Sequence, residues 1–140
     1  MFYGIEYSDL KPENGDFSFV GSLGGLYERL LVCWRKETCA PRMRERWSES
    51  NPTCGQCSIT SFLVEDIFGG EVYGVPLGDG NFHCFNVVGD AVFDLTNAQF
   101  DRPLEYTKDY PQTRLVHFAK EEKRSRYEKL KALLLLLSAK

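Results

Sequence analysis

Two β-rich runs joined by a turn of two residues restrict the possible folds of this chain more than any other feature of its sequence. The runs Asn81–Val88 and Ala91–Thr96 are separated only by Gly89 and Asp90. Such a pair favours a tight hairpin, because Gly and Asp tolerate the positive φ angles that a two-residue turn requires. The sequence therefore predicts an antiparallel pair of strands here.

The two-residue turn also predicts which side chains share a face of the sheet. In this register Phe85 lies opposite Asp94, and His83 lies opposite Thr96. Side chains alternate along a strand, so His83 and Asp94 become diagonal neighbours on one face, with backbones about 7–8 Å apart. One hydrogen bond between imidazole and carboxylate closes such a gap. A three-residue turn would put the two on opposite faces, so their pairing depends on this register.

Apolar periodicity and Gly or Pro stops predict the elements around the hairpin. We expect helices from Leu26 to about Glu37, from Cys57 to Phe68 and from about Glu121 onward, and strands at Glu71–Val75 and Arg114–Phe118. The buried stripes of the second and third helices are Ile59, Phe62, Leu63 and Ile67, and Tyr127, Leu130, Leu134 and Leu137. A helix first, antiparallel strands next and a helix last, without βαβ alternation, indicate an α+β fold.

The length of 140 residues is typical of a single domain, which we expect to span residues 1–140. Residues 1–25 are expected to be irregular with short strands, and residues 26–140 to form the core of the fold. A net charge of −3 gives no overall attraction to nucleic acid or to an anionic membrane. The most apolar run, Leu133–Leu137, is far shorter than the ~20 residues needed to span a bilayer.

Five cysteines, an odd number in a chain long enough to fold without disulfides, favour a reducing compartment. The first residues, Met-Phe-Tyr-Gly-Ile-Glu, carry neither the basic nor the apolar region of a secretory signal. We therefore expect a cytoplasmic protein whose cysteines serve as packing residues, ligands or nucleophiles.

Cys57 is the best candidate nucleophile among the five cysteines. It follows the loop Pro52-Thr53-Cys54-Gly55-Gln56 and opens a predicted helix. The partial positive charge and unpaired N–H groups of a helix N-terminus stabilise a thiolate, which lowers the pKa of a cysteine from about 8.5. The same N–H groups face the position where an oxyanion forms during acyl transfer. The alternative interpretation is a small residue that fills a tight helix start.

A thiol nucleophile needs a base, and the chain has two histidines. His117 lies in the run Leu-Val-His-Phe without an acidic or thiol neighbour, so we expect it to be structural or at the surface. His83 has the predicted contact with Asp94. A carboxylate in that position fixes the tautomer of the imidazole, which then takes the thiol proton. The residues are therefore consistent with a triad of Cys57, His83 and Asp94.

These segments resemble the transglutaminase superfamily. Gly55-Gln56-Cys57 is similar to the Gly-Gln-Cys segment around the transglutaminase nucleophile, and His83-Cys84-Phe85-Asn86 followed by Asp94-Leu95-Thr96 is similar to its His-Ala-Trp-Asn and Asp-Pro-Thr patterns. More closely, residues 34–100 resemble the YunG-like family of small proteins. The matching positions are Trp34 with Glu37-Thr38, Trp47-Ser48, Asn51-Pro52, Gly55-Gln56-Cys57, Thr60, Gly69-Gly70-Glu71, His83, Asn86, Asp94-Leu95-Thr96 and Gln99-Phe100, extended by Arg126-Tyr127 and Leu130.

The resemblance implies a papain-like or transglutaminase-like fold, in which a thiol-bearing helix packs on an antiparallel sheet that carries His and Asp. It implies Cys57 as nucleophile, His83 as general base and acid, and Asp94 as the orienting carboxylate. The implied oxyanion or substrate-binding groups are the backbone N–H of Cys57 and the side chains of Gln56, Asn51 and Asn86.

The activity implied by the resemblance is that of a thiol-dependent hydrolase or acyl transferase, of deamidase, amidase or peptidase type, acting on an amide, ester or protein substrate without cofactor or metal. Ser58 and Phe85 replace the tryptophans that follow the thiol and the histidine in enzymatic transglutaminases. The short interval between Cys57 and His83 leaves no room for the extra strands and calcium-binding elements of those enzymes. We therefore do not expect calcium-dependent crosslinking.

Other interpretations of the same residues stay open. Cys54-Gly55-Gln56-Cys57 has the spacing of a thioredoxin-like redox pair, and also that of a zinc site completed by one or two of Cys39, His83 and Cys84. A non-catalytic binding module that kept the fold is a further alternative. The run Leu133–Leu137 covers all sides of a helix, so the sequence is compatible with a monomer and with a homodimer.

Overall fold

A computed structural model describes residues 1–138 of the chain and has an α+β architecture. Its sheet has four strands in the order β3-β2-β1-β4, and all neighbouring strands are antiparallel. The strands are β1 (Glu71–Pro76), β2 (Phe82–Val88), β3 (Ala91–Phe93) and β4 (Pro111–Gln112). The α-helices are α1 (Leu23–Cys33), α2 (Cys57–Phe68), α3 (Arg114–His117) and α4 (Glu121–Ser138), and the short 3-10 helices are η1 (Ile5–Tyr7), η2 (Gly15–Val20), η3 (Pro41–Arg46) and η4 (Asn97–Gln99).

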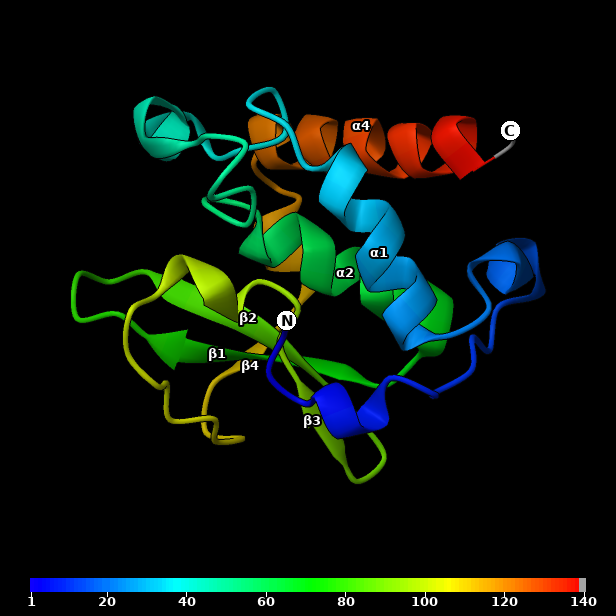
Figure 1. Cartoon of the computed structure of the whole chain (residues 1–140). Helices are drawn as coiled ribbons and strands as arrows, with labels where there is room; N and C mark the ends of the chain where they lie inside the picture. The colour runs from blue at the N-terminus through cyan, green and yellow to red at the C-terminus, as the bar shows by residue number, and fades with distance from the viewer. Residues whose placement is uncertain (139–140) are drawn as a thin grey trace.

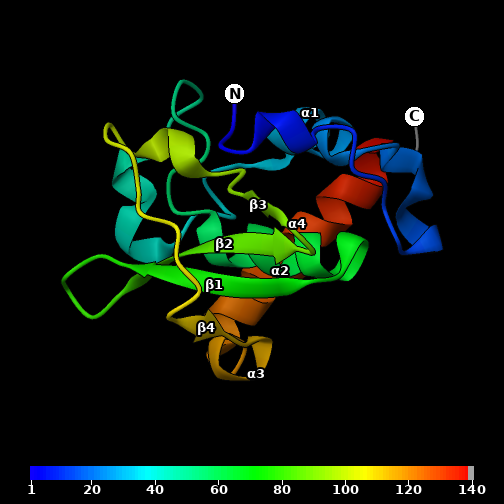
Figure 2. The same cartoon turned by 90° about the horizontal axis from the view of Figure 1, so that it is seen from below.

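The long helices α1, α2 and α4 form a layer on one face of the sheet (Figure 1). Helix α2 contacts both β2 and α4, so it lies between the sheet and the outer helix. The opposite face of the sheet carries a smaller apolar cluster, on which Leu104 and Tyr106 pack. The segment that contains these two residues passes in front of β2 and β1 in Figure 2. Both faces of the sheet are therefore covered.

The predicted hairpin is present in the predicted register. The observed pairs are Val88–Ala91, Val87–Val92 and Asn86–Phe93. Gly89 and Asp90 therefore form the turn, and Gly89 has the positive φ, 60°, that such a turn requires. Strand β3 ends at Phe93, so Asp94 follows the strand and pairs with Tyr3 in an isolated antiparallel bridge.

Helix α2 begins at Cys57 and ends at Phe68, as the sequence predicts. The predicted stripe of Ile59, Phe62, Leu63 and Ile67 is fully buried. Helix α4 begins at Glu121, also as predicted. Its residues Tyr127, Leu130 and Leu134 are buried, and Leu137 is partly buried against the same core. These helices follow the apolar periodicity closely because that periodicity matches one buried face.

Helix α1 differs from its predicted span of Leu26 to Glu37 at both ends. It begins earlier because the hydroxyl of Ser22 accepts a hydrogen bond from the N–H of Gly25 and so caps the helix. It ends at Cys33 because Trp34 has an extended backbone. The indole N–H of Trp34 donates to the hydroxyl of Thr60 (2.9 Å), which ties this end of α1 to α2.

The predicted strand at Arg114–Phe118 is wrong, because this segment forms helix α3. The hydroxyl of Thr113 accepts a hydrogen bond from the N–H of Val116 and caps the helix. The guanidinium of Arg114 donates to the carboxylate of Glu65 (2.7 Å) and to the carbonyl of Phe62 (3.1 Å), both in α2. A local cap and a tertiary contact thus outweigh the strand preference of the apolar run.

Residues 1–25 contain the 3-10 helices η1 and η2 in place of the short strands that we expected. Phe2, Phe17 and Val20 from this segment are buried in the main core together with residues of α1 and α2. The segment also reaches the hairpin through the bridge between Tyr3 and Asp94. The first residues therefore contribute to the same core as the helices.

Leu135 and Leu136 in α4 are 42% and 63% exposed. They lie on the side of the helix opposite to the buried Leu130 and Leu134, as expected where leucines cover all sides of a helix. Within residues 1–138, no helix combines the length and the apolar composition that crossing a membrane requires.

Candidate functional site

His83 and Asp94 form a buried pair on the face of the sheet opposite to α2. His83 lies in β2 and Asp94 follows β3, and each side chain is only 1% exposed. The Nε2–H of His83 donates to Oδ2 of Asp94 over 2.6 Å. The contact follows from the register of the hairpin, since a two-residue turn brings these positions to one face.

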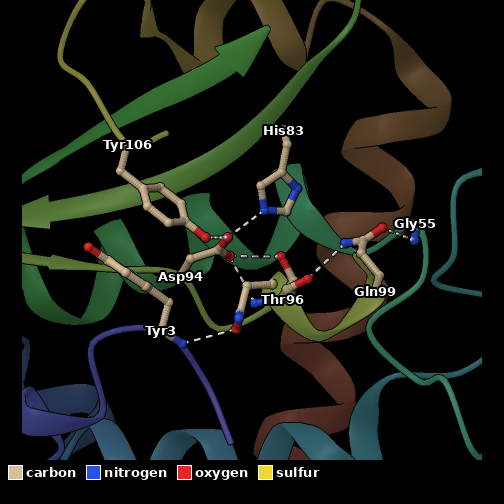
Figure 3. Close-up of polar contacts among 8 residues, drawn as sticks. Tyr3, Gly55, His83, Asp94, Thr96, Gln99 and Tyr106 are labelled. Carbon is tan, nitrogen blue, oxygen red and sulfur yellow. Dashed lines mark hydrogen bonds and ion pairs between the residues drawn. The ribbon is translucent and has the colours of Figure 1, made fainter. Parts of the chain in front are cut away.

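The carboxylate of Asp94 is held by two further residues (Figure 3). Oδ1 accepts hydrogen bonds from the backbone N–H of Thr96 (3.0 Å) and from its hydroxyl (3.2 Å). Oδ2 also accepts one from the hydroxyl of Tyr106 (2.8 Å). The ring of Tyr106 is in turn stacked on Tyr3 and lies edge-on to Phe85. Four donated hydrogen bonds therefore satisfy both oxygens of this buried carboxylate and fix its orientation.

Tyr106 is a site residue that the sequence did not predict. It lies in the irregular segment between η4 and β4, where the sequence has no apolar periodicity. Its hydroxyl reaches Asp94 only because this segment folds back over the sheet. No local pattern signals such a contact.

The charge of Asp94 controls the protonation of His83. Burial lowers the pKa of His83, but the charge and hydrogen bond of Asp94, with a smaller contribution from Cys57, outweigh this effect and raise the pKa to about 10. The ring edge is also covered by Phe100, whose centroid lies 4.8 Å from that of the imidazole in a T-shaped arrangement. His83 is therefore an oriented imidazolium at neutral pH, and its Nδ1 faces away from the carboxylate.

Cys57 is the first residue of α2 and is partly exposed to solvent. The residue before it, Gln56, makes no capping hydrogen bond with its side chain. By contrast, Ser22 and Thr113 cap α1 and α3. The first N–H groups of α2 have no partner within the helix, so they remain available to a negative charge next to the thiol.

The pKa of Cys57 is well below its ordinary value. The largest cause is a hydrogen bond from the thiol of Cys84, and burial opposes it. A hydrogen bond and the positive charge of His83, together with the backbone N–H of Cys84, lower the pKa of Cys57 further. The same contact raises the pKa of Cys84, which stays a protonated donor. His83 and Cys84 together therefore favour the thiolate form of Cys57.

Cys84 is a second neighbour of the thiol that the sequence did not assign. Alternation along β2 puts the Cys84 side chain on the α2 face, opposite to that of His83, and it is fully buried there. Both residues nevertheless lower the pKa of Cys57, which begins the helix that packs on β2. The adjacent pair His83-Cys84 was visible in the sequence, but the position of the helix end was not.

The remaining predicted binding residues lie in different environments. Asn86 is buried on the α2 face, where its amide donates to the carbonyl of Ser61 (2.8 Å), so it ties β2 to α2. Gln56 is fully buried and its amide donates to the carbonyl of Arg35 (3.0 Å), while its Oε1 has no partner among residues 1–138. Asn51 is partly buried in the turn that precedes Cys54.

His117 is separate from the His83–Asp94 pair. Its ring is partly buried against Phe62, and its nitrogens contact Gln112 (2.8 Å) and Lys123 (2.9 Å). Burial and the nearby charge of Lys123 lower the pKa of His117 to about 4, so it is neutral at pH 7. This agrees with the structural role expected from its sequence neighbours.

Cys33, Cys39 and Cys54 are buried thiols with raised pKa values. Burial raises the pKa of Cys33 and of Cys39 to about 11, and it also raises that of Cys54. All five cysteines are free. Within residues 1–138, no three His, Cys, Asp or Glu side chains come together as a metal ion would require. The site therefore combines one thiol with a lowered pKa, one imidazole with a raised pKa and one buried carboxyl group.

Comparisons with known proteins identify relatives of this chain. The sequence model of the YunG protein family matches residues 22–136. The protein named "Uncharacterized protein YunG" from Bacillus subtilis (strain 168) is 34% identical over 71 residues, which make up 51% of this chain and 61% of that relative. The matched region thus spans less than two thirds of the relative's length. No solved structure matches the chain.

Proposed function

This chain belongs to the YunG family, and for this member we propose a thiol-dependent hydrolase or acyl transferase that acts on an amide or ester. Cys57 is the nucleophile, His83 the general base and acid, and Asp94 the residue that orients the imidazole. The substrate class includes a carboxamide side chain or a peptide bond of a protein, so deamidase, amidase and peptidase chemistry all fit.

The observation that carries this proposal is the direction of the His83 hydrogen bond. Because Nε2 is bound to Asp94 over 2.6 Å, Nδ1 is the ring nitrogen that remains for the thiol. The same imidazole is among the groups that lower the pKa of Cys57. A carboxylate, an imidazole and a thiol in sequence, with the thiol at an open helix N-terminus, are the arrangement that acyl transfer by cysteine requires.

The reaction would run in two halves. The Cys57 thiolate attacks the carbonyl carbon, and the oxygen becomes an oxyanion that accepts hydrogen bonds from the free N–H groups of α2. His83 then gives its proton to the leaving amine or alcohol, the bond to that group breaks, and a thioester with Cys57 remains. In the second half neutral His83 takes a proton from water or an amine, which attacks the thioester and restores the thiolate and the imidazolium.

A papain-like or transglutaminase-like fold is part of the proposal. It is supported by a thiol-bearing helix, α2, packed on an antiparallel sheet whose strands β2 and β3 lead to His83 and Asp94. A reducing compartment such as the cytoplasm suits this chemistry, because thiolate attack requires Cys57 to stay free.

Labelling with electrophilic acyl probes tests the function. We expect a probe to modify wild-type protein at Cys57 and to leave the Cys57→Ala variant unlabelled. His83→Ala and Asp94→Ala should slow labelling by about 10²–10⁴-fold, because a base and its orienting group typically contribute that much. Mass spectrometry of the peptide that contains Cys57 measures the rate for this thiol alone.

Cys33→Ala is the matched control, since it removes a buried thiol with a raised pKa and should leave the labelling unchanged. Labelling of Cys57 at the rate of an unactivated thiol would contradict the proposal. In that case a binding module that kept the fold would be the better description.

A further inference from the structure

Gln99 connects the loop before Cys57 to the loop that carries Asp94. Its Oε1 accepts a hydrogen bond from the backbone N–H of Gly55 (3.3 Å), and its Nε2 donates to the backbone carbonyl of Thr96 (3.0 Å). Both contacts are visible in Figure 3, where the side chain spans the gap between the two loops. One partly buried side chain therefore joins segments that lie 41 positions apart in the sequence.

These contacts extend to the imidazole. Thr96 holds Oδ1 of Asp94 through its N–H and its hydroxyl, and Oδ2 of Asp94 holds His83. The path from Gly55 to His83 thus consists of hydrogen bonds through Gln99, Thr96 and Asp94. Phe100, the residue after Gln99, packs its ring on His83. Gln99 therefore contacts the loop before Cys57, and its neighbour Phe100 contacts the imidazole of His83.

The Gly55 end of this path is closely packed and hydrogen-bonded. The φ of Gly55 is +70°, and a Cβ there would lie 2.5 Å from Sγ of Cys39. The carbonyl of Gly55 accepts a hydrogen bond from the N–H of Ala40 (3.0 Å), while Gln99 takes its N–H. Gly55 is therefore held from two sides, two residues before the thiol.

We propose that Gln99 is a positioning residue that sets the distance and direction of the Cys57 thiol relative to the His83 imidazole. This inference rests on the proposed function, because it assigns a role within the same site. The physical reason is that Cys57 and His83 lie in different elements, and a charge pair weakens as its partners move apart. Only a side chain long enough to reach both loops, with a donor and an acceptor at its end, can make both contacts.

The test compares wild-type protein with Gln99→Met, which keeps the length and shape of the side chain but removes both hydrogen bonds. The rate of iodoacetamide alkylation at Cys57 is followed against pH by mass spectrometry. We expect the apparent pKa of Cys57 to rise by at least one unit in Gln99→Met, which makes alkylation about tenfold slower below that pKa.

Asn14→Leu provides the matched control. The Asn14 amide also joins two segments, by donating to the carbonyl of Asp66 near the other end of α2, and it caps η2. Its removal should lower the stability of the protein and leave the alkylation profile of Cys57 unchanged. Thermal unfolding of both variants shows whether they have lost comparable stability.

The outcomes separate this inference from the proposed function. A low pKa of Cys57 that persists in Gln99→Met overturns the positioning role alone. An ordinary pKa of Cys57 in the wild type overturns both the positioning role and the function. If the apparent pKa of Cys57 rose as much in Asn14→Leu as in Gln99→Met, the cause would be lost stability. That result would also overturn the positioning role.

Discussion

Asp94 has the most constrained environment of the residues in the site. A buried carboxylate is costly unless its oxygens are paired, and here both oxygens accept two hydrogen bonds each. Three of the four donors come from groups other than the imidazole, so the position of the carboxylate does not depend on His83 alone. This explains how one short contact can both orient His83 and keep it protonated.

The two histidines have opposite pKa shifts, which makes them a sensitive test of the structure. His83 should stay protonated until the pH approaches about 10, and His117 should stay neutral until the pH falls to about 4. The reasons are the Asp94 carboxylate beside His83 and the burial of His117 beside Lys123. Imidazole proton shifts measured by NMR against pH report both values, with His117→Gln used to assign the signals.

These shifts also determine how stability depends on pH. His83 has a raised folded-state pKa, so its contribution to the free energy of unfolding is fully present below pH 6.5 and is lost as the pH rises through about 10. His117 has a lowered pKa, so its contribution is present above pH 6.5 and is lost as the pH falls through about 4. A His83 signal that titrates near pH 6.5 would contradict the pairing with Asp94.

At the scale of elements, the connection from α2 to β1 depends on two glycines. Gly69 ends the helix and Gly70 begins the approach to the sheet, with φ values of 79° and 78°. A Cβ on Gly70 would lie 2.2 Å from the carbonyl oxygen of Val87 in β2. The chain entering β1 therefore approaches the backbone of β2 so closely that only a residue without a Cβ fits at this position.

Gly70→Ala should destabilise the protein by about 3 kcal/mol. A positive φ costs an L-residue roughly 1–2 kcal/mol, and the overlap with the Val87 carbonyl adds overpacking strain of roughly 1–3 kcal/mol. Urea unfolding measures the change. Gly89→Ala is the control, because Gly89 also has a positive φ but nothing lies within 4 Å of its added Cβ. Gly89→Ala should lower the free energy of unfolding by only about 1 kcal/mol. An equal decrease in both variants would contradict the close packing at Gly70.

At the scale of the whole molecule, the N-terminal segment is part of the main core. Phe17 is 4% exposed and packs in the same cluster as α1 and α2, although it belongs to a stretch without periodicity. Tyr3 pairs with Asp94 and stacks on Tyr106, so the segment also reaches the site. The N-terminal segment is therefore a larger part of the core than its irregular sequence indicates.

Phe17→Ala should lower the free energy of unfolding by about 3–5 kcal/mol, because it leaves a cavity in the main core. Phe19→Ala is the matched control in the same 3-10 helix, since Phe19 is only partly buried and should cost about 1 kcal/mol. Chemical denaturation compares the two. A loss of less than about 1 kcal/mol for Phe17→Ala would show that the segment is an appendage outside the core.

The sequence alone was sufficient where a local rule decides the outcome. The bounds and buried stripe of α2 follow from a 3.6-residue period, and the meeting of His83 with Asp94 follows from a two-residue turn and a period of two. Only the tertiary structure identified α3, the core position of Phe17 and the interactions of Tyr106, Cys84 and Gln99. Those features depend on partners far away in the sequence, and no short-range pattern of residues encodes which distant segment will pack against which.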